Sequence, residues 1–140
     1  FSNTILTQAN LVEANLSGAN FCQANLKESN VEGANLTNST FQNADLSETN
    51  LTGVFLKNSN LTDANFTNSE LIAADLTGSD LTGTNMHNAY LNHADLSGTN
   101  LKSTLNLTSE QVETAFINQE TQLPDSIPIV WISKTEYEFK

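Results

Sequence analysis

Residues 9–26 read ANLVEANLSGANFCQANL, and this stretch shows the pattern that decides the fold. An apolar residue stands at every fifth position, and the register runs unbroken through 21 positions from Phe1 to Leu101. A helix repeats every 3.6 residues and a strand every two, so a period of five fits neither. The chain must therefore turn once in every repeat.

A small residue accompanies each apolar centre at the position two residues before a centre. Over the 21 places of this frame from Thr4 to Thr104, the last of which precedes Asn106 where the pattern fails, it is Ala ten times, Ser five times, Thr five times and Val once. Residues two apart in extended backbone point the same way. Each repeat therefore directs one small and one large side chain inward, while the other three residues face water or form a corner.

The glycines locate that corner. All six fall two residues after an apolar centre, and Asn or Asp fills seven more of these places. Gly, Asn and Asp best tolerate the left-handed backbone conformation that tight turns often need. The turn chemistry thus agrees with the apolar register.

The spacing of the bulky centres indicates how many corners close one coil. Phe1, Phe21 and Phe41 are separated by 20 residues, and Phe66 and Met86 show the same spacing. Four repeats per coil, with coils stacked at ~4.8 Å, predict an all-β, four-sided solenoid of about five coils. Its predicted structural core includes Phe1, Phe21, Phe41, Leu46, Leu51, Leu61, Phe66 and Met86.

The repeats resemble the A(D/N)LXX signature of the pentapeptide-repeat family. The quoted motif recurs as Ala9-Asn10-Leu11, Ala44-Asp45-Leu46, Ala64-Asn65-Phe66 and Ala94-Asp95-Leu96. The resemblance covers about three quarters of the chain. It implies a right-handed quadrilateral β-helix with the central Leu and Phe residues stacked inside. It also implies a family that is numerous in cyanobacteria and occurs in the thylakoid lumen as well as the cytosol.

The residue before each centre should point outward. Asn or Asp holds 15 of 21 places, and the exceptions are Ile5, Thr40, Phe55, Glu70, Tyr90 and Leu105, the last of which precedes Asn106 as the pattern fails. Phe55 and Tyr90 put exposed aromatic rings where the repeat normally has a polar side chain. Aromatic residues are favoured at interface hot spots, so both are candidate protein contacts, although repacking beside Val54 explains Phe55 equally well.

The repeat frame dissolves after Leu101, which divides the chain into a β-helix at 1–105 and a capping helix with an irregular tail at 106–140. Thr108 and Gln111 form a predicted capping box, and a short helix should follow to about Asn118. Its apolar residues Val112, Ala115 and Phe116 would cover the last coil.

The two ends of the chain raise further alternatives. The apolar run at 127–132, which includes Trp131, either packs on the helix or offers a docking surface. The N-terminal coil has no comparable cover, so missing residues or a second copy, forming a homodimer through the solenoid end, would have to supply one. A start at Phe1 suggests that something upstream was cleaved, trimmed or left out, which leaves cytoplasm, thylakoid lumen and periplasm open.

Charge and chemistry narrow the functional classes. The net charge of −11 argues against nucleic acid and anionic membranes as direct partners, so we expect another protein. No stretch is long and apolar enough for membrane insertion. The solenoid carries ten acidic residues and three lysines, spread diffusely over its walls. The simpler interpretation of this acidic charge is that it keeps the protein soluble. The resemblance adds the alternative of an acidic DNA mimic that inhibits or protects DNA gyrase.

Catalysis requires reactive groups beside a concavity, whereas this core is filled by Leu and Phe. We therefore expect no enzyme activity, no catalytic residue, no cofactor and no metal. His87 and His93, with Asp95, are more simply exposed residues than metal ligands, and Cys22 occupies an outward position. No uninterrupted Thr column supports ice binding. The sequence predicts a non-catalytic scaffold for protein contacts.

Overall fold

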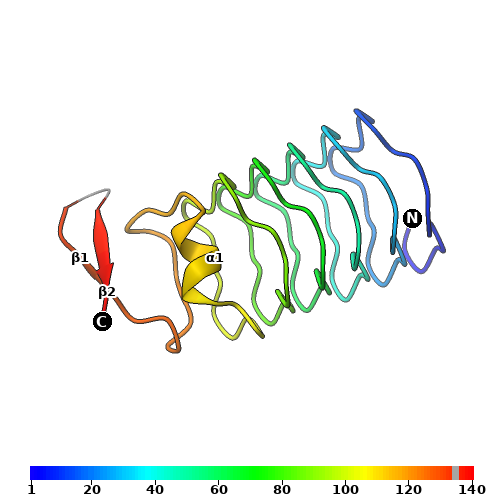
Figure 1. The fold of residues 1–140 in the computed structure, drawn as a ribbon. Helices are drawn as coiled ribbons and strands as arrows, with labels where there is room; N and C mark the ends of the chain where they lie inside the picture. Colours follow the sequence, from blue (N-terminus) through cyan, green and yellow to red (C-terminus); the bar gives the residue numbers. More distant parts are fainter. Residues whose placement is uncertain (134–135) are drawn as a thin grey trace.

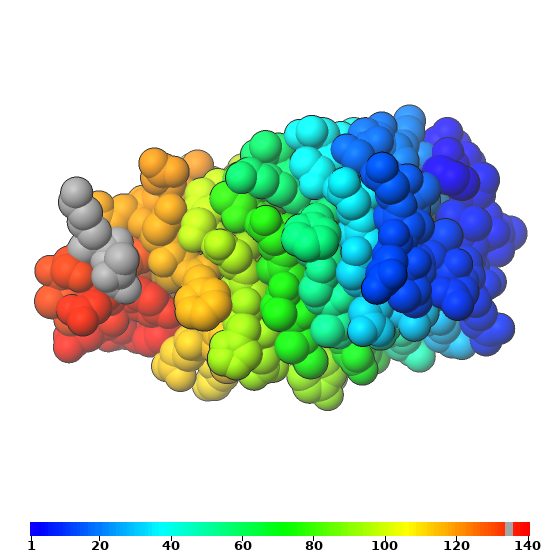
Figure 2. Space-filling model, turned by 90° about the horizontal axis from the view of Figure 1, so that it is seen from above, coloured from blue at the N-terminus to red at the C-terminus, as the bar shows by residue number. Residues whose placement is uncertain are grey.

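The computed structural model describes residues 1–133 and 136–140. Coils stack into a rod with the N-terminus at one end (Figure 1). At the other end lie helix α1, Ser109–Glu113, and a hairpin of strands β1, Ile129–Trp131, and β2, Tyr137–Phe139. The space-filling view shows successive coils as bands across the surface (Figure 2).

Single parallel bridges between residues 20 apart hold the coils together, from Ile5 with Asn25 to Asn85 with Leu105. At each bridge the flanking backbone groups also pair. The N–H of Leu26 donates to the carbonyl of Asp45 at 2.8 Å, and the N–H of Asp45 donates to the carbonyl of Ala24 at 2.9 Å. Four five-residue repeats thus complete one coil, and each wall contributes one bridged residue.

The predicted corners are confirmed, because φ is positive at every place two residues after a centre, from Asn3 to Ser103. A backbone bond closes each corner, as where the N–H of Ala24 donates to the carbonyl of Phe21 at 2.9 Å. Packing adds to the preference for glycine at Gly78, where a Cβ would lie 2.6 Å from Oδ1 of Asn58.

The interior is a continuous column of apolar side chains. Phe21 and Phe41 stack with ring centroids 4.7 Å apart and planes 5° apart. Buried hydroxyls at the small position donate either to the coil before, as from Oγ of Ser59 to the carbonyl of Leu36 at 3.0 Å, or within their own corner, as from Oγ of Ser69 to the carbonyl of Phe66 at 2.8 Å. Of the predicted core, these residues are at most 1% exposed: Phe21, Phe41, Leu46, Leu51, Leu61, Phe66 and Met86.

Phe1 is a correction to the predicted core. Its ring stacks on Phe21 at 4.9 Å, yet the residue is 54% exposed because no coil covers its outer side. The other centres of this coil, Leu6, Leu11 and Leu16, are only partly buried for the same reason.

The helix is shorter than the sequence predicts, since α1 ends at Glu113 and not near Asn118. Phe116 returns to the coil register: its N–H donates to the carbonyl of Ala94 at 2.8 Å, and its carbonyl accepts from Leu96 at 2.8 Å. The expectation that Phe116 covers the last coil is wrong, because this bridge leaves the residue 59% exposed.

The tail contains a hairpin that sequence analysis did not predict. β1 and β2 pair antiparallel, with Ile129 opposite Phe139. The ring of Trp131 meets that of Tyr137 edge to face at 5.4 Å, and the Tyr137 hydroxyl donates to the carbonyl of Val112 at 3.4 Å. The hairpin therefore packs toward α1, as in the packing interpretation of Trp131. Within the described ranges, no helix is long and apolar enough to cross a membrane.

Inward and outward positions should differ sharply in their effect on stability. Leu51 is 1% exposed, so Leu51→Ala should lower the free energy of unfolding by ~2 to 5 kcal/mol through the cavity it leaves. Asn50 makes only half-exposed bonds to Thr52 and Glu32, so Asn50→Ala should cost about 1 kcal/mol or less. Chemical denaturation would measure both. Equal, small losses would contradict the inward assignment of Leu51.

Candidate protein-contact surfaces

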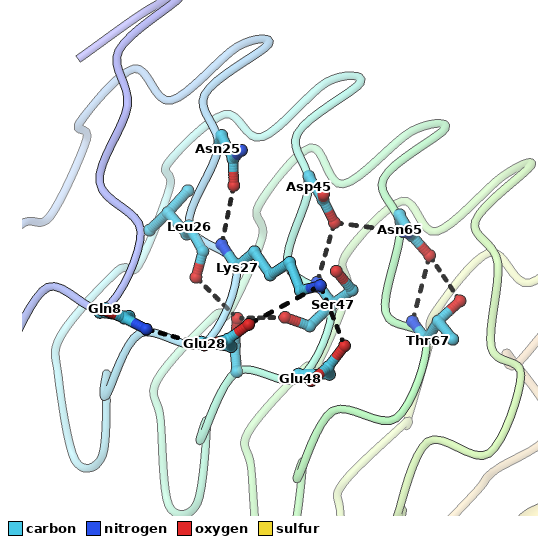
Figure 3. Close-up of polar contacts among 11 residues, drawn as sticks. Gln8, Asn25, Leu26, Lys27, Glu28, Asp45, Ser47, Glu48, Asn65 and Thr67 are labelled. Atoms are coloured by element: carbon cyan, nitrogen blue, oxygen red, sulfur yellow. Dashed lines mark hydrogen bonds and ion pairs between the residues drawn. The ribbon is translucent and has the colours of Figure 1, made fainter.

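The outward Asn and Asp side chains brace the corners. Oδ1 of Asn25 accepts from the N–H of Lys27 at 3.0 Å, and Oδ1 of Asp45 accepts from that of Ser47 at 3.0 Å (Figure 3). Neighbouring coils are also linked, since Nδ2 of Asn65 donates to Oδ1 of Asp45 at 3.1 Å. Most of these side chains thus have a structural task on the surface.

The wall drawn in Figure 3 also carries a small charge cluster. Nζ of Lys27 lies 3.2 Å from Oε1 of Glu48 and 3.7 Å from Oε1 of Glu28. The hydrogen bond and charge of Glu48 raise the pKa of Lys27, with a smaller contribution from Glu28. Such exposed pairs add little stability. Their effect is to neutralise part of the acidic charge of this wall.

Phe55 and Tyr90 interrupt the polar outer surface, being 50% and 55% exposed. Phe55 bridges Asn35 and Asp75, whereas Tyr90 bridges Glu70. The two rings therefore belong to different columns of the rod, and Trp131 belongs to the terminal hairpin. No ring contact joins any two of these three across residues 1–133 and 136–140.

The remaining candidate groups do not form a reactive cluster. The ring of His93 contacts Phe116 with centroids 6.2 Å apart, whereas His87 borders another region, described below. Among the described residues, no three His, Cys, Asp or Glu side chains are grouped to hold a metal ion. Cys22 is a partly exposed free thiol.

A solvent-open hollow of about 610 Å³ lies between the last coil and α1, and sequence analysis missed it. Tyr90 and Leu91 line it from the coil, and Glu110 and Gln111 line it from the helix. The backbone N–H of Glu110 and, to a smaller extent, the Thr108 hydroxyl lower the pKa of the Glu110 carboxyl group. The available sequence signal was the loss of the apolar register after Leu101.

Gln111 connects the helix to the coil. Its Oε1 accepts from the N–H of Thr108 at 2.9 Å, which with the Thr108 hydroxyl completes the capping box. Its Nε2 donates to the carbonyl of Met86 at 2.9 Å and to that of Ala89 at 2.8 Å. One side-chain amide thus serves both the helix start and the edge of the last coil.

Comparison with known proteins identifies the repeat. Residues 4–43, 39–78 and 69–105 match the family model of pentapeptide repeats, with eight copies. Comparison with curated proteins gives no match.

Solved structures agree with this architecture. The pentapeptide repeat protein Rfr23 of the cyanobacterium Cyanothece 51142 is 26% identical, with a TM-score of 0.58; the match covers 71% of this chain and 63% of Rfr23. A pentapeptide repeat protein of the Arabidopsis thaliana thylakoid lumen is 24% identical, with a TM-score of 0.53 and coverage of 79% and 69%. QnrB1, a plasmid-mediated fluoroquinolone resistance protein, is 20% identical, with a TM-score of 0.53 and coverage of 90% and 65%. The latter two show the fold alone, a right-handed β-helix, and the chain spans less than two thirds of the length of Rfr23.

The double role of Gln111 gives a prediction with an internal control. Thr108→Ala removes only the helix cap and should cost about 1 kcal/mol. Gln111→Ala also leaves the carbonyls of Met86 and Ala89 without this donor, so it should cost about 1 to 2 kcal/mol more. Denaturant titration of both variants would measure the difference, and equal losses would contradict the link to the coil edge.

Proposed function

The chain belongs to the pentapeptide repeat family, and from this premise we propose that it is a non-catalytic scaffold that contacts another protein through the outer walls of its β-helix. The observation that carries the proposal is that inward and outward positions of each repeat have different structural roles. Inward positions are filled with packed apolar or small side chains, and most outward amides brace corners. This leaves the departures from the repeat as the residues free to contact a partner.

The architecture of the scaffold is part of the proposal. Residues 1–105 form about five coils, and residues 106–140 supply a cap and tail. The buried Val112 and the bonds of Gln111 to the last coil support α1 as the cap. At the opposite end, the exposed Phe1 and the partly buried Leu6 support contact with a second copy.

Charge favours a partner with a cationic or neutral surface. The net charge of −11 would repel nucleic acid and anionic lipid. The acidic residues are spread over several walls, and Lys27 partly neutralises one of them. This distribution does not favour the gyrase alternative, which therefore enters as an outcome of the experiment.

Phe55 provides the sharpest test on the walls. Phe55→Asn restores the usual repeat residue, so the thermal midpoint should stay the same or rise, while partner affinity should fall about fivefold or more because an exposed hot-spot ring is lost. The partner would be captured from a lysate with immobilised chain, identified by mass spectrometry, purified and titrated.

Thr40→Asn, which restores the usual repeat residue on another wall, is the matched control and should leave that affinity unchanged. Unchanged affinity in Phe55→Asn would remove Phe55 from the contact. Recovery of gyrase, with inhibition of supercoiling by the purified chain, would replace the scaffold proposal by the DNA-mimic alternative.

A further inference from the structure

The coil-to-coil hydrogen bonds are interrupted at one place beside the hollow. In each of the four preceding coils, the backbone N–H groups equivalent to those of Asn88 and Leu91 donate to carbonyls of the next coil. In the coil just before, Asn68 donates to the carbonyl of His87 at 2.9 Å, and Leu71 donates to that of Tyr90 at 2.9 Å. The N–H groups of Asn88 and Leu91 have no hydrogen-bond partner among the described residues.

The interruption has sharp limits. Just before it, the N–H of Met86 donates to the carbonyl of Leu105 at 2.8 Å, and just after it, the N–H of His93 donates to that of Thr114 at 2.7 Å. Between Leu105 and Thr114 the chain leaves the coil path to form α1. The missing segment of coil is the one that would have supplied the two carbonyls.

One acceptor of this edge, the carbonyl of Ala89, already has a donor, whereas the N–H groups of Asn88 and Leu91 have no acceptor within residues 1–133 and 136–140. Gln111 donates to the carbonyl of Ala89. In the earlier coils, the equivalent carbonyl accepts from a backbone N–H of the next coil, as that of Ser69 does from Tyr90. Leu91 is 1% exposed, so its N–H is poorly placed to bond to bulk water, and an unpaired buried N–H is costly. Both Asn88 and Leu91 line the solvent-open hollow.

We propose that this hollow binds an extended, basic peptide segment of a partner protein, which supplies two backbone carbonyls to the N–H groups of Asn88 and Leu91 and packs on the ring of Tyr90. The inference rests on the proposed protein-contact function and gives it a location. The segment replaces the missing stretch of coil, so recognition is a form of strand addition.

The hydrogen-bond pattern and the charge define the ligand. The carbonyls that the equivalent donors bind, those of His87 and Tyr90 in the last coil, are three residues apart. The residue after the first carbonyl has a positive φ in every coil, so we expect Gly or Asn there in the peptide. Among the described residues, Glu110 is the only carboxylate that lines the hollow, and no Lys or Arg lines it, which favours a basic segment.

Peptide selection and amide NMR test the proposal on the whole chain. The probe is a phage-displayed library of random linear peptides selected on the immobilised chain, and the selected peptides are then synthesised and titrated. We expect basic sequences whose binding moves the amide proton signals of Asn88 and Leu91 downfield and slows the exchange of Leu91 about tenfold or more. The matched amides of Glu48 and Leu51, which lie outside the hollow and are bonded at 2.9 and 2.8 Å, should not change.

Two helix residues supply a matched pair of variants. Glu110→Lys should weaken the selected peptides about fivefold or more, whereas Glu113→Lys, an equal change of charge on a residue outside the hollow, should alter binding less than about twofold. The amide spectra would show that both variants fold.

The outcomes separate this inference from the proposed function. Peptides that leave the amides of Asn88 and Leu91 unmoved, or that bind Glu110→Lys as well as the unmodified chain, would overturn the hollow as their site. A chain that selects no peptide yet captures a partner through Phe55 would overturn the inference and keep the scaffold function. A chain that binds neither would overturn both.

Discussion

The hydrogen bonds between successive coils are the interaction on which the rest of the structure depends. Each wall contributes only one bridged residue per coil, so no strand is long enough to be stable by itself. Stability comes from stacking, which pairs backbone groups and aligns the central side chains in one operation. In repeat proteins of this kind, the central coils are therefore stabilised on both sides. A terminal coil has a neighbour on one side only, so part of its backbone and core is left uncovered.

The two terminal coils differ in what contacts their outer sides. At the C-terminal end, Val112 of α1 is buried in the core cluster, and Gln111 donates to two carbonyls of the last coil. A five-residue helix cannot reproduce all the donors and acceptors of a coil. At the N-terminal end, the same apolar column reaches solvent at Phe1. The surfaces of greatest chemical interest thus follow from incomplete stacking.

The outer surface follows a second constraint. Each corner, once every five residues, requires a positive φ. The backbone N–H groups at these corners donate hydrogen bonds to the side-chain oxygens of outward Asn and Asp residues. These side chains look like a polar recognition surface in the sequence, yet they hold the corners. Phe55 and Tyr90 cannot accept such a bond, so their rings contribute nothing to corner bracing. This is why departures from the repeat carry more information about function than the repeat itself.

Features that depend only on residues close together in the chain could be predicted from the sequence. The left-handed corner needs only the residues of one turn, and the capping box needs only Thr108 and Gln111. Features that depend on segments adjacent in space, but distant in the chain, could not be predicted from the sequence. Phe1 has the right residue type for the core but lacks a coil on one side, and the helix stops early because Phe116 pairs with Asp95 in the bridge pattern.

The sequence by itself determined the solenoid, its four repeats per coil and its inward and outward positions, because a strict period acts through local geometry and repeats the same decision many times. Only the tertiary structure decided which groups are left unsatisfied. Leu71 and Leu91 occupy equivalent places in the repeat, yet the N–H of Leu71 is bonded and that of Leu91 borders an open hollow. The physical reason is that a backbone donor is satisfied by whatever segment lies beside it in space, and at Leu91 the chain has turned away to form α1.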